Sequence, residues 1–211
     1  MNIILSIMQR KLFVRLSLLC ALMLALGLSS CKKDQKPTPV PVTPPLQMEY
    51  FNLDSKEITA DAPGFSLDVN HDGRRDLAFN TLLVGDGINR VDKVQFLISS
   101  NIKVNLPVNG KEEIPVMSRG DLVVPGNFSG YQWFELSSIL LVQKVISFTV
   151  PPVWEGHWKT AVHKYLPYQV VVDEKIYNGW VELTVDIAHE KIVLHKAAIC
   201  KEANKTVKAG E

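Results

Sequence analysis

Apolar and polar residues alternate along much of the chain after residue 48. The clearest case is the segment 181–186, in which Val181, Leu183 and Val185 are separated by single polar residues. Successive side chains of a strand point to opposite faces of a sheet, so a period of two places the three apolar residues on one face. The segment therefore predicts a half-buried β-strand.

This strand is expected to form a hairpin with the segment that follows it. We place the two strands at Lys175–Asp186 and Glu190–Ala198, joined by a short connection. A charge in the apolar stripe, as in Leu183→Asp, is expected to be severely destabilising because it would be buried without a partner.

Short β-rich runs recur along the rest of the chain, separated by pairs typical of tight turns, such as Asp86-Gly87. Many short strands at this spacing are typical of a sandwich or a barrel. We predict an all-β protein with a single antiparallel β-sandwich (jelly-roll-like) domain over residues 48–211. Ser137–Lys144 fits either a short helix or a buried strand. The other expected strands are Glu49–Leu53, Leu77–Val84, Lys93–Ser99, Ile102–Leu106, Asp121–Val124, Gln132–Leu136, Ile146–Val150 and Tyr168–Asp173.

Residues 1–30 have the layout of a lipoprotein signal peptide. Three basic residues, the last of them Arg15, precede the apolar run Leu16–Leu28, and small residues lead to Cys31. The 13 apolar residues of the run fall short of the ~20 that a membrane-spanning helix needs, which argues against a transmembrane segment. The segment Leu28-Ser-Ser-Cys31 resembles the bacterial lipobox. This resemblance implies that the Cys31 thiol carries a diacylglyceryl lipid with fatty-acyl chains such as palmitate.

Residues 31–47 are expected to be a tether. Five prolines lie between Pro37 and Pro45, and such a density favours an extended chain that reaches up to ~45 Å. Lys32, rather than aspartate, follows the lipidated cysteine. By analogy with enteric bacteria, this favours a lipid anchor in the outer membrane, with the domain facing either the periplasm or the cell surface.

The net charge and the cysteine content limit the classes of function that fit this chain. The chain has 23 basic and 22 acidic residues, and residues 1–30 hold three basic and no acidic ones, so removing them leaves 20 against 22, a net charge of −2. A chain without a clustered basic face is not expected to bind nucleic acid. With Cys20 in the signal peptide and Cys31 lipidated, Cys200 has no disulfide partner and is expected to be a half-buried small apolar residue near the end of a strand.

The segment 68–76 has oxygen-bearing side chains at every second position. Taking Asp68 as the first position, Asn70 is third, Asp72 fifth, the Arg74 carbonyl seventh and Asp76 ninth, the order in which an EF-hand loop supplies calcium ligands. The twelfth position is a phenylalanine where an EF-hand has glutamate, and the flanks are strand-like. The segment instead resembles the Asp-x-Asn-x-Asp-Gly-x-x-Asp loops of secreted β proteins, such as integrin-type propeller repeats.

Two interpretations of this loop stay open. It is either a structural calcium site or a turn whose side chains cap backbone amides. Three carboxylates held close together repel one another without a cation, and we therefore expect calcium, bound by Asp68, Asn70, Asp72, Arg74 and Asp76.

Aromatic residues gather in the last third of the domain. Trp154, Trp158 and Trp180 are candidates for stacking against the ring of a carbohydrate ligand, although packing inside the domain is the commoner role of tryptophan. The five histidines show no closely spaced pair and are not expected to form a zinc site.

Several short segments resemble a group of uncharacterised small bacterial lipoproteins. The resemblance covers about residues 48–211 and implies a secreted all-β domain that opens with a calcium-type loop, without implying an activity. The segments that carry it are Trp154–Trp158, Lys164–Pro167, Tyr177–Val181 and Val207–Gly210.

We therefore expect a lipid-anchored binding or structural module of the cell envelope rather than an enzyme, with a structural calcium loop and a carbohydrate as the best candidate ligand. The alternative is a glycan-acting hydrolase that uses a carboxylate pair, Asp173 or Glu174 with Glu182.

Overall fold

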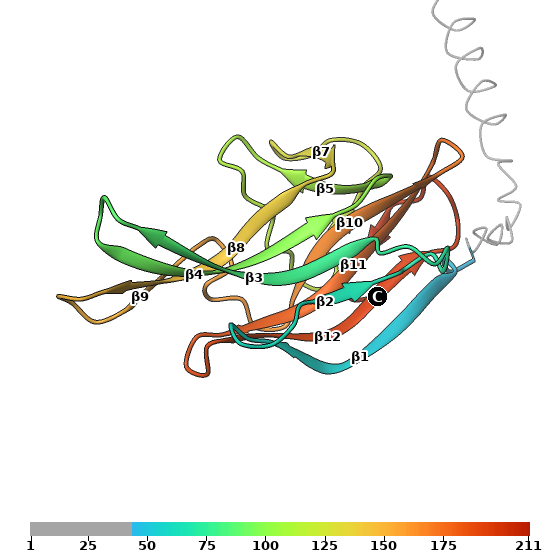
Figure 1. The fold of residues 1–211 in the computed structure, drawn as a ribbon. Helices are drawn as coiled ribbons and strands as arrows, with labels where there is room; N and C mark the ends of the chain where they lie inside the picture. Colours follow the sequence, from blue (N-terminus) through green and yellow to red (C-terminus); the bar gives the residue numbers. More distant parts are fainter. Residues whose placement is uncertain (1–43) are drawn as a thin grey trace, which may run out of the picture. The chain divides into compact units, whose positions relative to one another are not determined.

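The computed structural model describes residues 44–211, and these residues form strands and turns with no helix. Two antiparallel sheets lie against each other (Figure 1). The six-stranded sheet has, in spatial order, β1 (Met48–Ile58), β12 (Lys191–Cys200), β11 (Lys175–Asp186), β10 (Lys164–Val172), β5 (Val104–Val108) and β7 (Gln132–Glu135). The five-stranded sheet has β2 (Phe65–Leu67), β3 (Leu77–Asp86), β4 (Val91–Ser100), β8 (Ser138–Ser147) and β9 (Val153–Glu155). The predicted antiparallel β-sandwich is confirmed.

Pro45–Glu211 forms a compact unit of its own. The predicted signal peptide, the predicted lipid acceptor Cys31 and all but the end of the predicted tether lie outside the described residues. Between residues 44 and 211 no helix is long and apolar enough to cross a membrane.

The predicted C-terminal hairpin is present as β11 and β12, which pair from Gly179–Ile199 to Asp186–Lys191. A register shift lies between Glu182 and Leu183. Leu183 is completely buried, as the alternation predicts.

The ambiguous segment Ser137–Lys144 is a strand. It forms most of β8, which pairs with β4 on one side and with β9 on the other. The strand expected at Ile146–Val150 is not a separate element, because β8 ends at Ser147.

Sheet residues are buried on both faces of the six-stranded sheet. One apolar cluster fills the space between the sheets and includes Val181 and Leu183. A second cluster lies on the opposite face and includes Trp180, the neighbour of Val181. It is flanked by the ladder of β6 (Leu122–Val123) and β13 (Val207–Lys208), so consecutive residues of β11 are buried on opposite sides.

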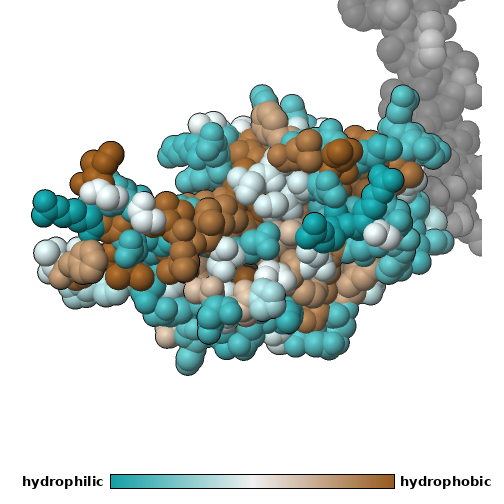
Figure 2. Space-filling model, viewed as in Figure 1, coloured by the Kyte–Doolittle hydropathy of each residue, from teal (hydrophilic) through white to brown (hydrophobic). Residues whose placement is uncertain are grey.

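The ends of β3, β4, β8 and β9 project beyond the six-stranded sheet in the view of Figure 1. Hydrophobic side chains are exposed there, and Figure 2 shows brown atoms over this region. The large exposed ones are Leu82, Leu83, Ile88, Phe148, Val150 and Val153.

Candidate functional site

The aspartate-rich loop connects β2 to β3 and is held by its own side chains. The Asp68 carboxylate accepts hydrogen bonds from the backbone amides of Asp72, at 3.2 Å, and Gly73, at 2.9 Å. Gly73 has φ of +82°, a left-handed conformation that glycine adopts without a steric penalty. Asp68 and Gly73 therefore set the turn.

Asn70 and Asp72 each cap an amide two residues further along the chain. Asn70 Oδ1 accepts from the Asp72 amide at 3.0 Å, and Asp72 Oδ1 accepts from the Arg74 amide at 2.8 Å. These are the contacts expected of an amide-capped turn. Each oxygen has a second lone pair, so the caps do not remove its capacity to bind a cation.

Asp76 closes the loop from inside the protein. It is only 4% exposed, its Oδ2 accepts from the Val69 amide at 2.8 Å, and its own amide donates to the Leu67 carbonyl at 2.8 Å. Burial raises the pKa of the Asp76 carboxyl; the Val69 hydrogen bond opposes the rise, and the charges of Asp72 and Asp68 add to it. The charges of Asp68 and Asp72 therefore act on the buried Asp76 carboxylate and oppose its ionisation.

The donor set of the loop suits calcium in its chemistry, because every predicted ligand is an oxygen atom. Only three of the five predicted ligands, Asp68, Asp72 and Asp76, are carboxylates. Within residues 44–211, no three side chains of His, Cys, Asp or Glu are grouped closely enough to form a metal site as they stand. A calcium ion would therefore have to draw the carboxylates together and use the Asn70 and Arg74 oxygens as well.

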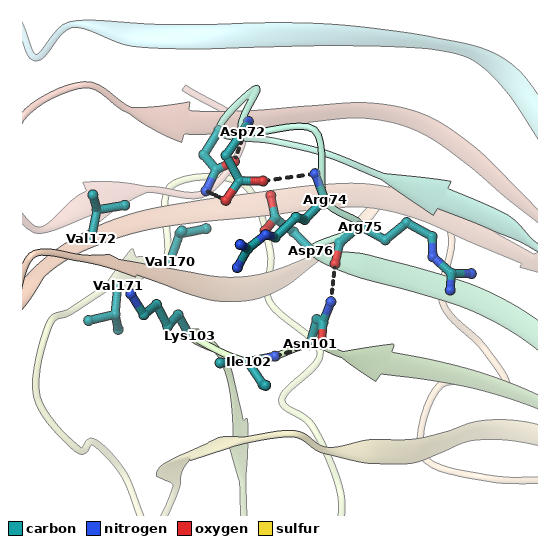
Figure 3. Close-up of a pocket in the computed structure, with 11 residues that line it drawn as sticks. Asp72, Arg74, Arg75, Asp76, Asn101, Ile102, Lys103, Val170, Val171 and Val172 are labelled. Carbon is teal, nitrogen blue, oxygen red and sulfur yellow. Dashed lines mark hydrogen bonds between the residues drawn. The ribbon is translucent and has the colours of Figure 1, made fainter.

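A hollow of about 210 Å³ lies beside the loop. Its walls are the end of β10 at Val170–Val172, the segment Asn101–Lys103 before β5, and the loop residues Asn70, Asp72 and Arg74–Asp76 (Figure 3). Sequence reasoning missed this hollow, because its three walls are far apart in the chain.

The tryptophans expected to stack on a sugar do not form a common surface, and this expectation is corrected. Trp158 is completely buried, and its indole Nε1 donates to the Ile114 carbonyl at 3.2 Å. Trp180 is 2% exposed and lies edge-on to Tyr165. Trp154 is half-buried against Phe96 in the five-stranded sheet. Two of the three rings therefore have no face available to a ligand.

The carboxylates of the hydrolase alternative do not form a pair. Asp173 and Glu174 lie in the exposed turn between β10 and β11, whereas Glu182 lies well along β11. At about 3.3 Å per residue, the strand separates Glu174 from Glu182 by roughly 20 Å or more. A glycosidase pair is separated by about 5–10 Å, so this expectation is also corrected.

Glu182 instead belongs to a polar cluster beside β11. Its carboxylate lies 2.8 Å from His163 Nδ1, and the His163 ring stacks on His195 with centroids 4.3 Å apart. His195 Nε2 lies 2.9 Å from the Thr184 hydroxyl. Burial lowers the pKa of His195, and the nearby His163 lowers it further, while Glu182 opposes the change.

Cys200 lies at the end of β12, as predicted, but it is completely buried in the second apolar cluster rather than half-buried. No protein-family model matches the chain, and neither a curated protein nor a solved structure matches it.

Proposed function

We propose that the protein is a lipid-anchored binding module of the bacterial cell envelope, with a structural calcium ion in the loop 68–76. The observation that carries the calcium proposal is the burial of Asp76 beside two further carboxylates. A divalent cation would offset their repulsion and would join the end of β2 to the start of β3. Calcium in this role stabilises the domain and takes no part in a reaction.

The anchor would be the lipid on Cys31, with residues 31–47 as a tether and the outer membrane as the destination. The domain would face the periplasm or the cell surface, and its ligand would be a carbohydrate. The separated carboxylates Glu174 and Glu182 leave no observation that favours a hydrolase.

Calcium binding is tested by the melting temperature of the full chain with 10 mM calcium and with EDTA. Extracellular calcium modules have dissociation constants of about 10⁻⁴–10⁻³ M, which corresponds to roughly 1.4–2.7 kcal/mol of stabilisation at this concentration. For a domain of this size, we expect the melting temperature to rise by roughly 3–10 °C.

Asp72→Ala should abolish this rise, whereas the control Asp61→Ala, at an exposed position outside the loop, should preserve it. Equal melting temperatures of the wild type in calcium and in EDTA would refute the calcium site and leave an amide-capped turn.

The anchor is tested separately by metabolic labelling with radioactive palmitate. The Cys31→Ala chain should lose the label and should no longer be found in the membrane fraction. The Cys20→Ala chain should keep the label and stay in the membrane fraction. A Cys31→Ala chain that still carries palmitate would exclude the proposed anchor.

A further inference from the structure

The hollow beside the aspartate loop has walls that are hydrogen-bonded to one another. The Asn101 amide donates to the Asp76 carbonyl at 3.0 Å, and the Asn101 side chain donates to the Arg75 carbonyl at 2.8 Å. The Val171 amide donates to the Lys103 carbonyl at 2.7 Å. These hydrogen bonds join the loop, the segment 101–103 and β10 into one preformed site. A preformed site favours binding because a ligand has to order few protein groups.

Two cationic side chains enter this hollow without an acidic partner. Figure 3 shows Arg74 reaching across it and the Lys103 stem extending toward Val170 and Val171, while the Arg75 side chain points away. Among residues 44–211, no carboxylate lies within ion-pair distance of either Arg74 or Lys103; the nearby Glu135 carboxylate accepts from the Lys103 backbone amide instead. Unpaired arginine and lysine in one recess are suited to a carboxylate or a phosphate.

The other walls limit what can carry that anionic group. Val172 and Ile102, both exposed, supply apolar surface, and the Asp72 carboxylate supplies acceptors for hydroxyl groups. The volume of about 210 Å³ is smaller than the roughly 300–1,000 Å³ of pockets for drug-sized ligands. The ligand must be small, with an anionic group, hydroxyl groups and one apolar face.

We propose that this hollow binds an acidic sugar, a pyranose ring that carries a carboxylate. Its carboxylate lies between Arg74 and Lys103, its hydroxyl groups donate to Asp72, and its C–H face packs on Val172 and Ile102. An acidic sugar is thus the ligand of the proposed binding module, and it binds at the end of β10 rather than at the tryptophans. A calcium ion in the loop would strengthen the site by reducing the negative charge of Asp72 and Asp76.

The test is a ligand-observed NMR titration of the full chain in detergent, at constant ionic strength, with glucuronate, glucose and inorganic phosphate as probes. Glucuronate should bind at least about tenfold more tightly than either glucose or phosphate. Arg74→Gln and Lys103→Gln should each weaken its binding by about 3- to 10-fold, the range for one charge-assisted contact at a partly exposed site. Arg119→Gln removes the same charge at an exposed position that does not line the hollow; it is the matched control and should change the affinity less than twofold.

The titration is run in EDTA and in calcium, so that the pocket and the calcium site are judged separately. Glucuronate should bind in both and more tightly in calcium, whereas failure of the calcium proposal alone would leave its binding in EDTA intact. Glucose binding as tightly as glucuronate would overturn the proposal. Phosphate binding as tightly as glucuronate would also overturn it, because the site would then recognise only an anion. Equal effects of Arg74→Gln and Arg119→Gln would place the ligand elsewhere.

Discussion

Tyr168 lies against Gly179 on the neighbouring strand, and its ring fills the space that a side chain at Gly179 would need. A Cβ atom on Gly179 would lie 2.3 Å from Tyr168 Cζ and 2.5 Å from the Ala198 carbonyl oxygen. The Tyr168 hydroxyl donates to that same oxygen at 3.0 Å. Because burial raises the pKa of Tyr168 well above its usual value, the hydroxyl stays protonated and keeps this bond.

Gly179→Ala should destabilise the domain by about 1–3 kcal/mol, the usual range for overpacking a filled core. The methyl group would displace the Tyr168 ring and break its bond to Ala198. Urea unfolding followed by circular dichroism measures the loss. Gly87→Ala is the control, because a Cβ at Gly87 meets nothing within 4 Å, and it should change stability by less than about 0.5 kcal/mol. Equal midpoints for the two variants would contradict the packing argument.

Leu183→Asp should prevent folding or reduce stability by at least about 4 kcal/mol, because Leu183 is completely buried in the core between the sheets and the new carboxylate would have no partner. Leu83→Asp makes the same chemical change at a residue that is 68% exposed. It should leave the melting temperature within a few degrees of the wild type. Similar expression and melting of both variants would mean that β11 does not face the core.

Asp76→Ala should destabilise the domain even in EDTA, by about 1–3 kcal/mol, because the buried Val69 amide would lose its acceptor. Asp76→Asn keeps an acceptor oxygen and removes the repulsion with Asp68 and Asp72, so it should lose less. Thermal melting in EDTA compares the two variants. An asparagine variant as unstable as the alanine variant would show that charge, rather than the hydrogen bond, is what Asp76 contributes.

The stability of the domain should fall as the pH drops below about 6.5, in part because of His195. The folded state lowers the pKa of this imidazole, so the unfolded chain binds its proton more readily and acid favours unfolding. Melting temperatures between pH 5 and pH 8 measure the dependence, and His195→Gln should flatten it. His157→Gln, at an exposed position, should leave it unchanged. A wild-type profile without any decline in this range would contradict the prediction.

The strands predicted from alternation are those with one face toward the core and a marked turn at the end. The hairpin of β11 and β12 was predictable because its pairing partners are neighbours in the sequence. The ladder of β6 and β13 was not, since each strand has only two residues and its partner lies more than eighty positions away. In the structure, β13 pairs with β6 and flanks the second apolar cluster on the outer face of the six-stranded sheet.

The burial of the tryptophans was not predictable for a related reason. The residue type shows that Trp158 and Trp180 have large apolar rings, which suits a core as well as a ligand surface. The choice depends on what lies across from each ring: the segment at Ile114 for Trp158, and Tyr165 for Trp180.

The sequence by itself determined the strand alternation, the turn at Gly73 and the spacing of the oxygen side chains in the loop, because these depend on backbone geometry over a few residues. Only the tertiary structure decided that Asp76 is buried beneath that loop and that Arg74 and Lys103 face one hollow. Both features depend on segments that sheet packing brings together from distant parts of the chain. The sequence near each residue does not show which distant segment packs against it.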